Sequence, residues 1–179
     1  MTPLVIGVTS HRNLSAREVE PIRQCVRDLF AQLKRDFPAL PLMMLSSLAE
    51  GGDQLVAEEA LAADARLLVP LPFSRELYAE DFSDAGRGAF FALCEQAEVL
   101  QVPLLPGNTQ SDIAAHGEAR DRQYAEAGVF IASHCHILLA LWDGRPSDLT
   151  GGTAQTVRYQ LEGVLPGSIG GAARHPAAV

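Results

Sequence analysis

The sequence predicts an α/β protein in which helices cover both faces of a parallel sheet. Short and almost wholly apolar runs alternate along the chain with longer segments whose apolar residues recur at helical spacing. Buried parallel strands are continuous apolar runs of this kind, because helices shield both of their faces. A regular alternation of strand and helix is typical of βαβ units. We therefore expect a Rossmann-like three-layer sandwich with at least five strands in the order 3-2-1-4-5.

The first predicted strand covers residues 4–9, and a helix follows it. Ser15 and Glu18 are spaced as in a capping box, in which each side chain accepts a hydrogen bond from the backbone of the other residue. Apolar residues then recur every three or four positions through Leu33, which predicts one buried helix face. Pro21 fits best in the first turn of a helix, so a later helix start is the alternative.

The remaining elements follow the same pattern and are separated by glycine, proline and polar residues. Further strands are predicted at 42–48, 66–71, 99–104 and 137–142, and helices at 53–63, 88–97, 118–133 and from 153 onward, with a polar loop at 106–117. No internal repeat or domain boundary interrupts this order. Residues 1–165 are therefore predicted to form one domain, and the segment 166–179, rich in glycine, alanine and proline, a flexible tail or linker.

Small and polar residues follow three of the predicted strands. In an open α/β sheet, ligands bind outside the carboxyl ends of the strands. These residues therefore predict one crevice for a polar ligand that bears a phosphate. The residues that we expect to line it are Gly7, Thr9, His11, Arg12, Ser47, Glu50, Gly51, Gly52, Arg120, Tyr124, Asp143, Gly151, Gly152, Thr153 and Ala154.

The segment 151–154 opens the last predicted helix and is the expected phosphate site. Glycine lets a ligand approach the backbone closely, and the first turn of a helix offers free N–H donors. The alternative is a glycine-rich loop that only turns the chain.

Two arginines are candidates for contact with the phosphate. Arg12 follows the first strand together with His11, and an arginine side chain can bind a phosphate through two donors. Arg120 lies four residues before Tyr124, so the two share a helix face and Tyr124 is available to stack on a base. The alternative for Arg120 is a surface ion pair with a neighbouring carboxylate.

Two carboxylates flank the glycines that follow the second strand. Asp53 is placed to cap the next helix, which is our interpretation of it. Glu50 has no evident capping role, so we expect it to accept hydrogen bonds from ribose hydroxyls or to act as an acid or base. A solvated loop carboxylate is the alternative for Glu50.

The net charge disfavours a broad surface for nucleic acid. The 179 residues are 47% hydrophobic and 20% charged, as in an ordinary globular protein, and the formal net charge is −8. Binding to nucleic acid generally requires clustered Lys and Arg. We therefore expect a small nucleotide-derived partner and no nucleic acid.

The cysteines and the apolar runs bear on the cellular setting. Three widely spaced cysteines form no disulfide pattern and no C-x-x-C pair, which predicts a reducing cytoplasm. No secretory leader is evident, and the longest apolar stretch, 127–142, is interrupted by His134 and His136. It is too short to span a membrane. We therefore expect no membrane contact.

No metal and no cofactor are expected. The run His134-Cys135-His136 contains metal-ligating residue types, but it lies where a helix leads into a strand. That position is at the opposite end of the sheet from the crevice. The chain contains neither a G-x-S-x-G elbow nor a Walker A motif.

Several motifs occur in one order along the chain and together resemble a known superfamily. They are Gly7–Arg12, Ser46–Ala57, Arg120 with Tyr124, and Leu141–Gly144 with Gly151–Ala154. This arrangement resembles the SLOG superfamily of Rossmann-like nucleotide-binding domains. That group includes the LOG or lysine decarboxylase-like phosphoribohydrolases, the fold of DNA-processing protein A and the amino-terminal domains of certain TRP channels.

The sequence departs from the phosphoribohydrolases of this superfamily. Their P-G-G-x-G-T-x-x-E motif ends in a catalytic glutamate, whereas here Thr150 replaces the proline, Ala154 a glycine, Gln155 the threonine and Arg158 the glutamate. Cleavage of an N-glycosidic bond requires a carboxylate near the ribose. The resemblance therefore implies a module that binds or senses a nucleotide-derived ligand, such as an ADP-ribose-like compound, and forms a homodimer or larger assembly. The alternatives are an N-glycosidase that uses Glu50, and a structural domain with a vestigial pocket.

Overall fold

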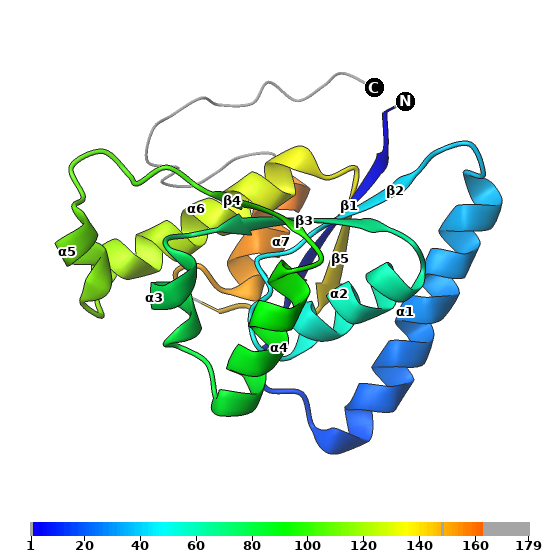
Figure 1. The fold of residues 1–179 in the computed structure, drawn as a ribbon, viewed down its shortest axis with the longest axis horizontal. Helices are drawn as coiled ribbons and strands as arrows, with labels where there is room; N and C mark the ends of the chain where they lie inside the picture. The colour runs from blue at the N-terminus through cyan, green and yellow to red at the C-terminus, as the bar shows by residue number, and fades with distance from the viewer. Residues whose placement is uncertain (1, 148, 163–179) are drawn as a thin grey trace.

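Five parallel strands form the centre of the protein, in the order β4-β3-β2-β1-β5 (Figure 1). The computed structural model describes residues 2–147 and 149–162. The strands are β1 (Leu4–Ser10), β2 (Leu42–Leu45), β3 (Arg66–Leu71), β4 (Glu98–Gln101) and β5 (Ile137–Leu141), and the helices are α1 (Ala16–Asp36), α2 (Gly52–Ala62), α3 (Arg75–Ala79), α4 (Asp84–Cys94), α5 (Gln110–Ala114), α6 (Glu118–His134) and α7 (Thr153–Glu162).

The expected Rossmann-like α/β sandwich is confirmed, but the expected strand order is wrong at one position. Strand β1 pairs with β2 on one side and directly with β5 on the other, and β4 lies beyond β3 at the far edge. Strand β4 contains Glu98 and Gln101 and is largely exposed. Polar residues of this kind are tolerated at a sheet edge and not beside a central strand. Strands β2, β3 and β4 are thus added on one side of β1 and β5 on the other, and such a switch point in an open parallel sheet is where ligands bind.

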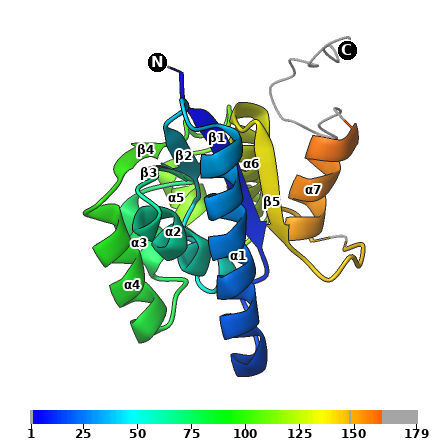
Figure 2. The same cartoon turned by 90° about the vertical axis from the view of Figure 1, so that its right-hand side faces the viewer.

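Helices cover the two faces of the sheet in separate groups. Helices α1, α2 and α4 pack together on one face, and α6 packs with α7 on the other (Figure 2). The inward side chains of the central strands are fully buried, including Ile6, Met44 and Val69. Burial of apolar surface on both faces explains why the inner strands β2 and β3 are almost free of polar residues.

Helix α1 begins at Ala16, as its capping box predicts, and not after Pro21. The backbone N–H of Ser15 donates a hydrogen bond to Glu18 Oε2 at 3.0 Å, and the reciprocal contact is also present. Pro21 lies inside the helix. Because proline has no N–H, the carbonyl of Arg17 lacks its helical partner. The two hydrogen bonds of the capping box thus contribute more to the stability of the helix start than the one missing backbone hydrogen bond costs.

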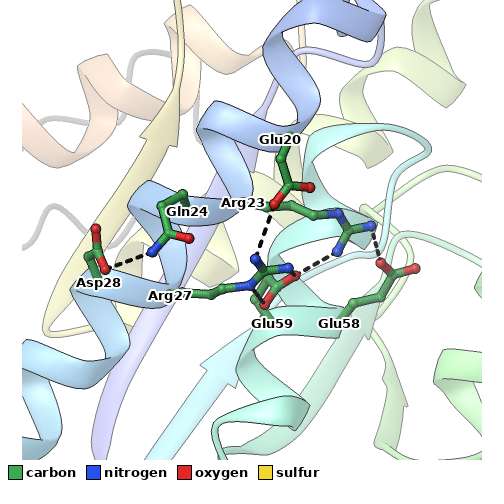
Figure 3. A network of polar contacts seen from close by, with 7 residues as sticks. All are labelled: Glu20, Arg23, Gln24, Arg27, Asp28, Glu58 and Glu59. Carbon is green, nitrogen blue, oxygen red and sulfur yellow. Dashed lines mark hydrogen bonds and ion pairs between the residues drawn. The ribbon is translucent and has the colours of Figure 1, made fainter.

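An ion-pair network joins α1 to α2 (Figure 3). The side chain of Glu59 on α2 is only 8% exposed and accepts hydrogen bonds from Arg23 Nη1 at 2.7 Å and Arg27 Nε at 2.9 Å. Arg23 also pairs with Glu58, and Arg27 with Glu20. These contacts fix the position of α2, whose first turn forms part of the crevice.

The short helices α3 and α5 are absent from the sequence prediction. Each has only five residues, and each is capped by a hydroxyl side chain, Ser74 or Thr109. A single turn carries too little periodicity to be recognised from spacing. No helix in the described part of the chain is both long and apolar enough to cross a bilayer. The predicted tail, 166–179, lies outside the described residues.

Candidate functional site

A cavity of about 300 Å³ lies at the carboxyl ends of β1 and β2, against the start of α7. Its position is the one expected for a ligand of an open α/β sheet. The predicted site residues that line it are Thr9, His11, Arg12, Ser47, Tyr124, Gly151, Gly152, Thr153 and Ala154. Sequence segments more than a hundred residues apart thus line one cavity.

The start of α7 offers two free backbone donors to this cavity. Gly151 has a φ of +78°, and a Cβ atom there would lie 2.9 Å from Tyr124 Cβ, so only glycine fits. The N–H of Gly152 bonds the carbonyl of Leu149 at 3.3 Å. The N–H groups of Thr153 and Ala154, both buried residues, have no acceptor within residues 2–147 and 149–162. They are the unpaired donors of a helix N-terminus.

Arg12 supplies an accessible positive charge to the same cavity. Its guanidinium carbon lies 5.9 Å from the centre of the Phe82 ring and 5.8 Å from that of Tyr124. No carboxylate in the described part of the chain forms an ion pair with it. Tyr124 also forms a side-chain hydrogen bond with Arg12, so the aromatic residues hold the guanidinium in place and its remaining N–H donors are available to a ligand.

Arg120 is engaged in the structure instead. It is 2% exposed and donates to the carbonyl of Ile113 at 2.8 Å and to Asp81 Oδ2 at 2.7 Å. Its guanidinium carbon also lies 4.4 Å from the centre of the Phe73 ring. Arg120 does not line the cavity of about 300 Å³ but an adjoining one of about 410 Å³, which Arg12 also lines. The predicted contact with the ligand phosphate in the first cavity therefore does not fit its position.

Asp81 connects Arg120 to Tyr124 and was missed by the sequence analysis. The Tyr124 hydroxyl donates a hydrogen bond to Asp81. Burial opposes the charge of Asp81, but the hydrogen bonds from Tyr124 and Arg120 outweigh it and hold the pKa of this carboxyl below its usual range. Burial raises the pKa of Tyr124 to about 12. Tyr124 therefore stays protonated, and its fixed ring forms a wall of the cavity.

Asp53 does not cap α2 and instead lies in the cavity wall. The capping position is held by Gly51, whose φ is +97°, and Asp53 lies in the first turn. It is 5% exposed and accepts a hydrogen bond from Ser10 Oγ at 2.5 Å. Burial raises its pKa to about 7, against the opposing hydrogen bonds from Ser10 and the Ala49 backbone. Its environment depends on β1, 43 residues earlier, so no local pattern could reveal it.

Glu50 has a structural role, contrary to the expectation that it has none. Its carboxylate accepts hydrogen bonds from the backbone N–H of Ser83, at 3.0 Å, and from the Ser83 hydroxyl. Ser83 is the N-cap of α4, and a Cβ on Gly86 of that helix would lie 2.5 Å from the Glu50 carboxylate. The Ser83 hydrogen bonds lower the pKa of Glu50. Glu50 does not line the cavity of about 300 Å³, although it lines a separate one of about 370 Å³ together with Arg12.

Three of the predicted glycines allow close packing around the cavity. A Cβ on Gly7 would lie 2.7 Å from Ile131 Cγ2 on α6, so Gly7 lies beneath the helix and not in the cavity. A Cβ on Gly51 would lie 2.0 Å from the Arg12 carbonyl, and one on Gly52 2.6 Å from Ser10 Cβ. Gly51 and Gly52 therefore hold the start of α2 against the end of β1.

His11 and Asp143 form a pair at the rim. Asp143 Oδ1 lies 3.5 Å from His11 Nε2, and both side chains are about half exposed. Of the two, only His11 lines the cavity. The run His134-Cys135-His136 lies at the other end of β5, where His136 Nδ1 accepts a hydrogen bond from Val5 N–H. No cluster of three metal-ligating side chains is found among the residues that the structure describes.

Two solved structures share this arrangement of elements. DNA processing protein A from Streptococcus pneumoniae matches with a TM-score of 0.58 and 14% identity, over 90% of this chain and 47% of that one. DNA processing protein A from Helicobacter pylori matches with a TM-score of 0.51 and 12% identity, over 89% of this chain and 60% of that one. The chain has the Rossmann-like fold of DNA-processing protein A. No protein-family model and no curated protein matches the chain.

The fold expected from the resemblance to the SLOG superfamily is therefore confirmed. The chain spans about half the length of the S. pneumoniae protein and somewhat more of the H. pylori protein.

The H. pylori structure describes a mode of single-stranded DNA binding. The expectation of no nucleic-acid partner is therefore wrong, because net charge sums the whole surface and does not describe local donors such as Arg12. The homodimer involves a second chain and stays a prediction, as does the cytoplasmic setting.

Proposed function

We propose that this chain binds a nucleotide or nucleotide-derived ligand, with a phosphate held between Arg12 and the start of α7. The observation that supports the proposal is that several hydrogen-bond donors with capacity for a ligand converge on one cavity. The Arg12 guanidinium lacks a carboxylate partner, and the N–H groups of Thr153 and Ala154 lack acceptors, in the described part of the chain. A phosphate accepts hydrogen bonds from a guanidinium and from helix-terminal amides alike.

The rest of the cavity supports a sugar or base beside that phosphate. Thr9 and Ser47 provide hydroxyls at the ends of β1 and β2, and the rings of Tyr78 and Tyr124 provide aromatic surface. A volume of about 300 Å³ lies at the lower end of the range typical of small-molecule sites. We favour binding of the ligand without its cleavage. Glu50 is the carboxylate expected to support N-glycosidic cleavage, but it lies outside this cavity and binds Ser83.

Calorimetric titration with AMP tests the proposal. Arg12→Ala should weaken binding on the order of tenfold or more, the factor expected for loss of a charged hydrogen bond worth about 1.5–3 kcal/mol. Thr153→Glu should abolish binding, because it places a negative charge at the phosphate position. Arg17→Ala, which removes an exposed arginine from α1, is the matched control. Unchanged affinity in both cavity variants would refute the phosphate site.

Single-stranded DNA is a second candidate ligand. The observation that favours it is the shared fold with the H. pylori protein, whose structure describes single-stranded DNA binding. Titration with a short oligothymidylate at several salt concentrations distinguishes the two ligands. Affinity for a strand should fall steeply with salt in proportion to the phosphates contacted, whereas affinity for one mononucleotide should fall only slightly.

A further inference from the structure

A second cavity adjoins the proposed nucleotide cavity at its phosphate end. Its volume is about 410 Å³, and Arg12, Tyr124 and the pair Gly151 and Gly152 line both cavities. Arg12 and the start of α7, which we propose to bind a phosphate, therefore lie where the two cavities meet. A ligand can extend from that phosphate into either cavity.

The two cavities differ in chemistry. Val8, Ala127 and Ile131 give the first cavity a mainly apolar wall. The second is lined in addition by Asp81, His116, Arg120, Asp121 and Thr150. Carboxylate oxygens accept hydrogen bonds from hydroxyl groups, while threonine and histidine can donate or accept. The second cavity therefore suits a group that carries several hydroxyls.

Arg120 lines the second cavity and has one buried donor without a partner among the residues that the structure describes. Arg120 uses its terminal nitrogens on Ile113, Leu77 and Asp81, but its buried Nε has no hydrogen-bond acceptor among the described residues. A buried donor without a partner is costly, and native proteins contain few of them. The Nε atom has no exposed surface, so an occupant with oxygen acceptors reduces this cost only when the Arg120 side chain shifts toward it.

We propose that the ligand is a nucleotide whose phosphate is bonded to a second hydroxyl-bearing group. The nucleoside lies in the first cavity, the bridging phosphate at Arg12, and the second sugar in the cavity of Arg120. This inference rests on the proposed function, because it uses the same phosphate position. A bridged phosphate of this kind occurs in soluble diphosphate-linked molecules and between successive nucleotides of a strand, and the two sources share one chemistry.

Titration of the full chain with three adenine ligands tests the inference. AMP ends at its phosphate, ADP-ribose continues through a diphosphate to a second ribose, and the deoxyadenosine dinucleotide continues through a phosphodiester. At least one of the two bridged ligands should bind on the order of tenfold tighter than AMP. Preference for ADP-ribose identifies a soluble ligand, and preference for the dinucleotide identifies a strand.

A double variant, His116→Ala with Asp121→Ala, tests the second cavity alone. Both side chains are exposed and line that cavity without lining the first, so the fold should persist. The double variant should reduce the affinity for the bridged ligand to about that for AMP and leave AMP binding unchanged. Glu118→Ala, an exposed residue of the same region outside both cavities, should change neither affinity.

The outcomes separate the two proposals. If AMP binds, but the bridged ligands bind no tighter and the double variant has no effect, the second subsite is wrong and the proposed function stands. If neither AMP nor any bridged ligand binds, the proposed function itself is wrong. Thr150→Trp gives an independent check, because it fills the second cavity and should likewise reduce only the advantage of the bridged ligand.

Discussion

The hydroxyl of Ser10 at the end of β1 donates a hydrogen bond of 2.5 Å to the buried carboxylate of Asp53 at the start of α2. This contact joins two elements that border the cavity, and it places a carboxyl group in the same wall as the positively charged Arg12. Because burial raises the pKa of Asp53 to about 7, the charge of the cavity changes near neutral pH.

Asp53 should make the protein less stable as pH rises from about 4 to about 7. The carboxyl ionises near pH 4 in the unfolded chain but only near pH 7 in the fold, so over this interval the unfolded state binds fewer protons. Asp53→Asn removes this dependence and retains an acceptor for Ser10. The free energy of unfolding of the variant relative to the unmodified protein should therefore increase from pH 4 to pH 8 by a few kcal/mol, about 1.4 for each unit of pKa shift. Urea denaturation at the two pH values measures this, and parallel pH profiles would contradict it.

The same titration should affect ligand affinity. Above pH 7 an ionised Asp53 repels an anion held by Arg12, so a phosphodiester ligand should bind more weakly at pH 8 than at pH 6. A phosphodiester is the suitable probe because its own charge does not change over this range. Calorimetry with Asp53→Asn should show equal affinity at both pH values, and a persisting difference would assign the effect to another group.

Glu50→Ala should reduce stability and leave nucleotide affinity unchanged. Its carboxylate binds both polar groups of Ser83 at the start of α4, and the loss of a comparable cap costs about 1–2 kcal/mol. Chemical denaturation and calorimetry with AMP measure the two quantities. Glu76→Ala removes an exposed carboxylate from α3 and serves as the control. A selective loss of AMP affinity would restore Glu50 to the binding site.

Glu59→Gln should destabilise the protein more than Glu58→Gln. The Glu59 side chain is 8% exposed and binds both Arg23 and Arg27, whereas that of Glu58 is 42% exposed. Loss of the buried partner should cost about 1–3 kcal/mol, and loss of the exposed one less than about 1 kcal/mol. Hydrogen bonds from Arg27 and Arg23 lower the pKa of Glu59 against a smaller effect of burial, so this stabilisation is present at neutral pH and is lost as pH falls below the usual pKa of glutamate. Denaturation of both variants at pH 7 decides the order.

Gly51→Ala should destabilise the fold strongly, whereas Gly88→Ala should not. Gly51 has a φ of +97°, and its Cβ would lie 2.0 Å from the backbone oxygen of Arg12. The substitution therefore displaces Arg12 as well, and AMP binding should weaken. Gly88 lies within α4 with open space around it, so alanine there should be neutral or stabilising by up to about 1 kcal/mol. Thermal unfolding of the two variants makes the comparison, and equal effects would argue against a strained start of α2.

The sequence predicts the features of this protein that depend on local patterns. The apolar strand runs, the Ser15–Glu18 capping box and the glycine-rich start of α7 are each encoded within a few residues, and each is found as expected. The cluster of residues at the strand ends was predictable as well, because parallel strands bring their carboxyl ends to one edge.

The features that the sequence did not predict depend on contacts between distant segments. Asp53 and Glu50 are three residues apart, and both follow the same strand. One is buried against Ser10 of β1, and the other binds Ser83 near α4. Asp53 therefore does not cap α2 as the sequence interpretation had it, and Glu50 does not lie free at the strand end. The edge position of β4 likewise depends on its pairing with β3, which only the assembled sheet determines, although the polar Glu98 and Gln101 are compatible with an edge.

The pairing of β1 with β5 also affects the order in which the protein folds. Ile6 is in register with Ile137, so these two strands close a loop of more than a hundred residues. Contacts between such distant segments form slowly, because the entropy of the intervening chain must be lost before the contact stabilises anything. During synthesis, strands β1 to β4 leave the ribosome well before β5 and α7. A growing chain can thus form most of its sheet before the backbone N–H groups of Thr153 and Ala154 have been synthesised. Ligand binding should therefore begin only when the domain is complete, and not during its early folding.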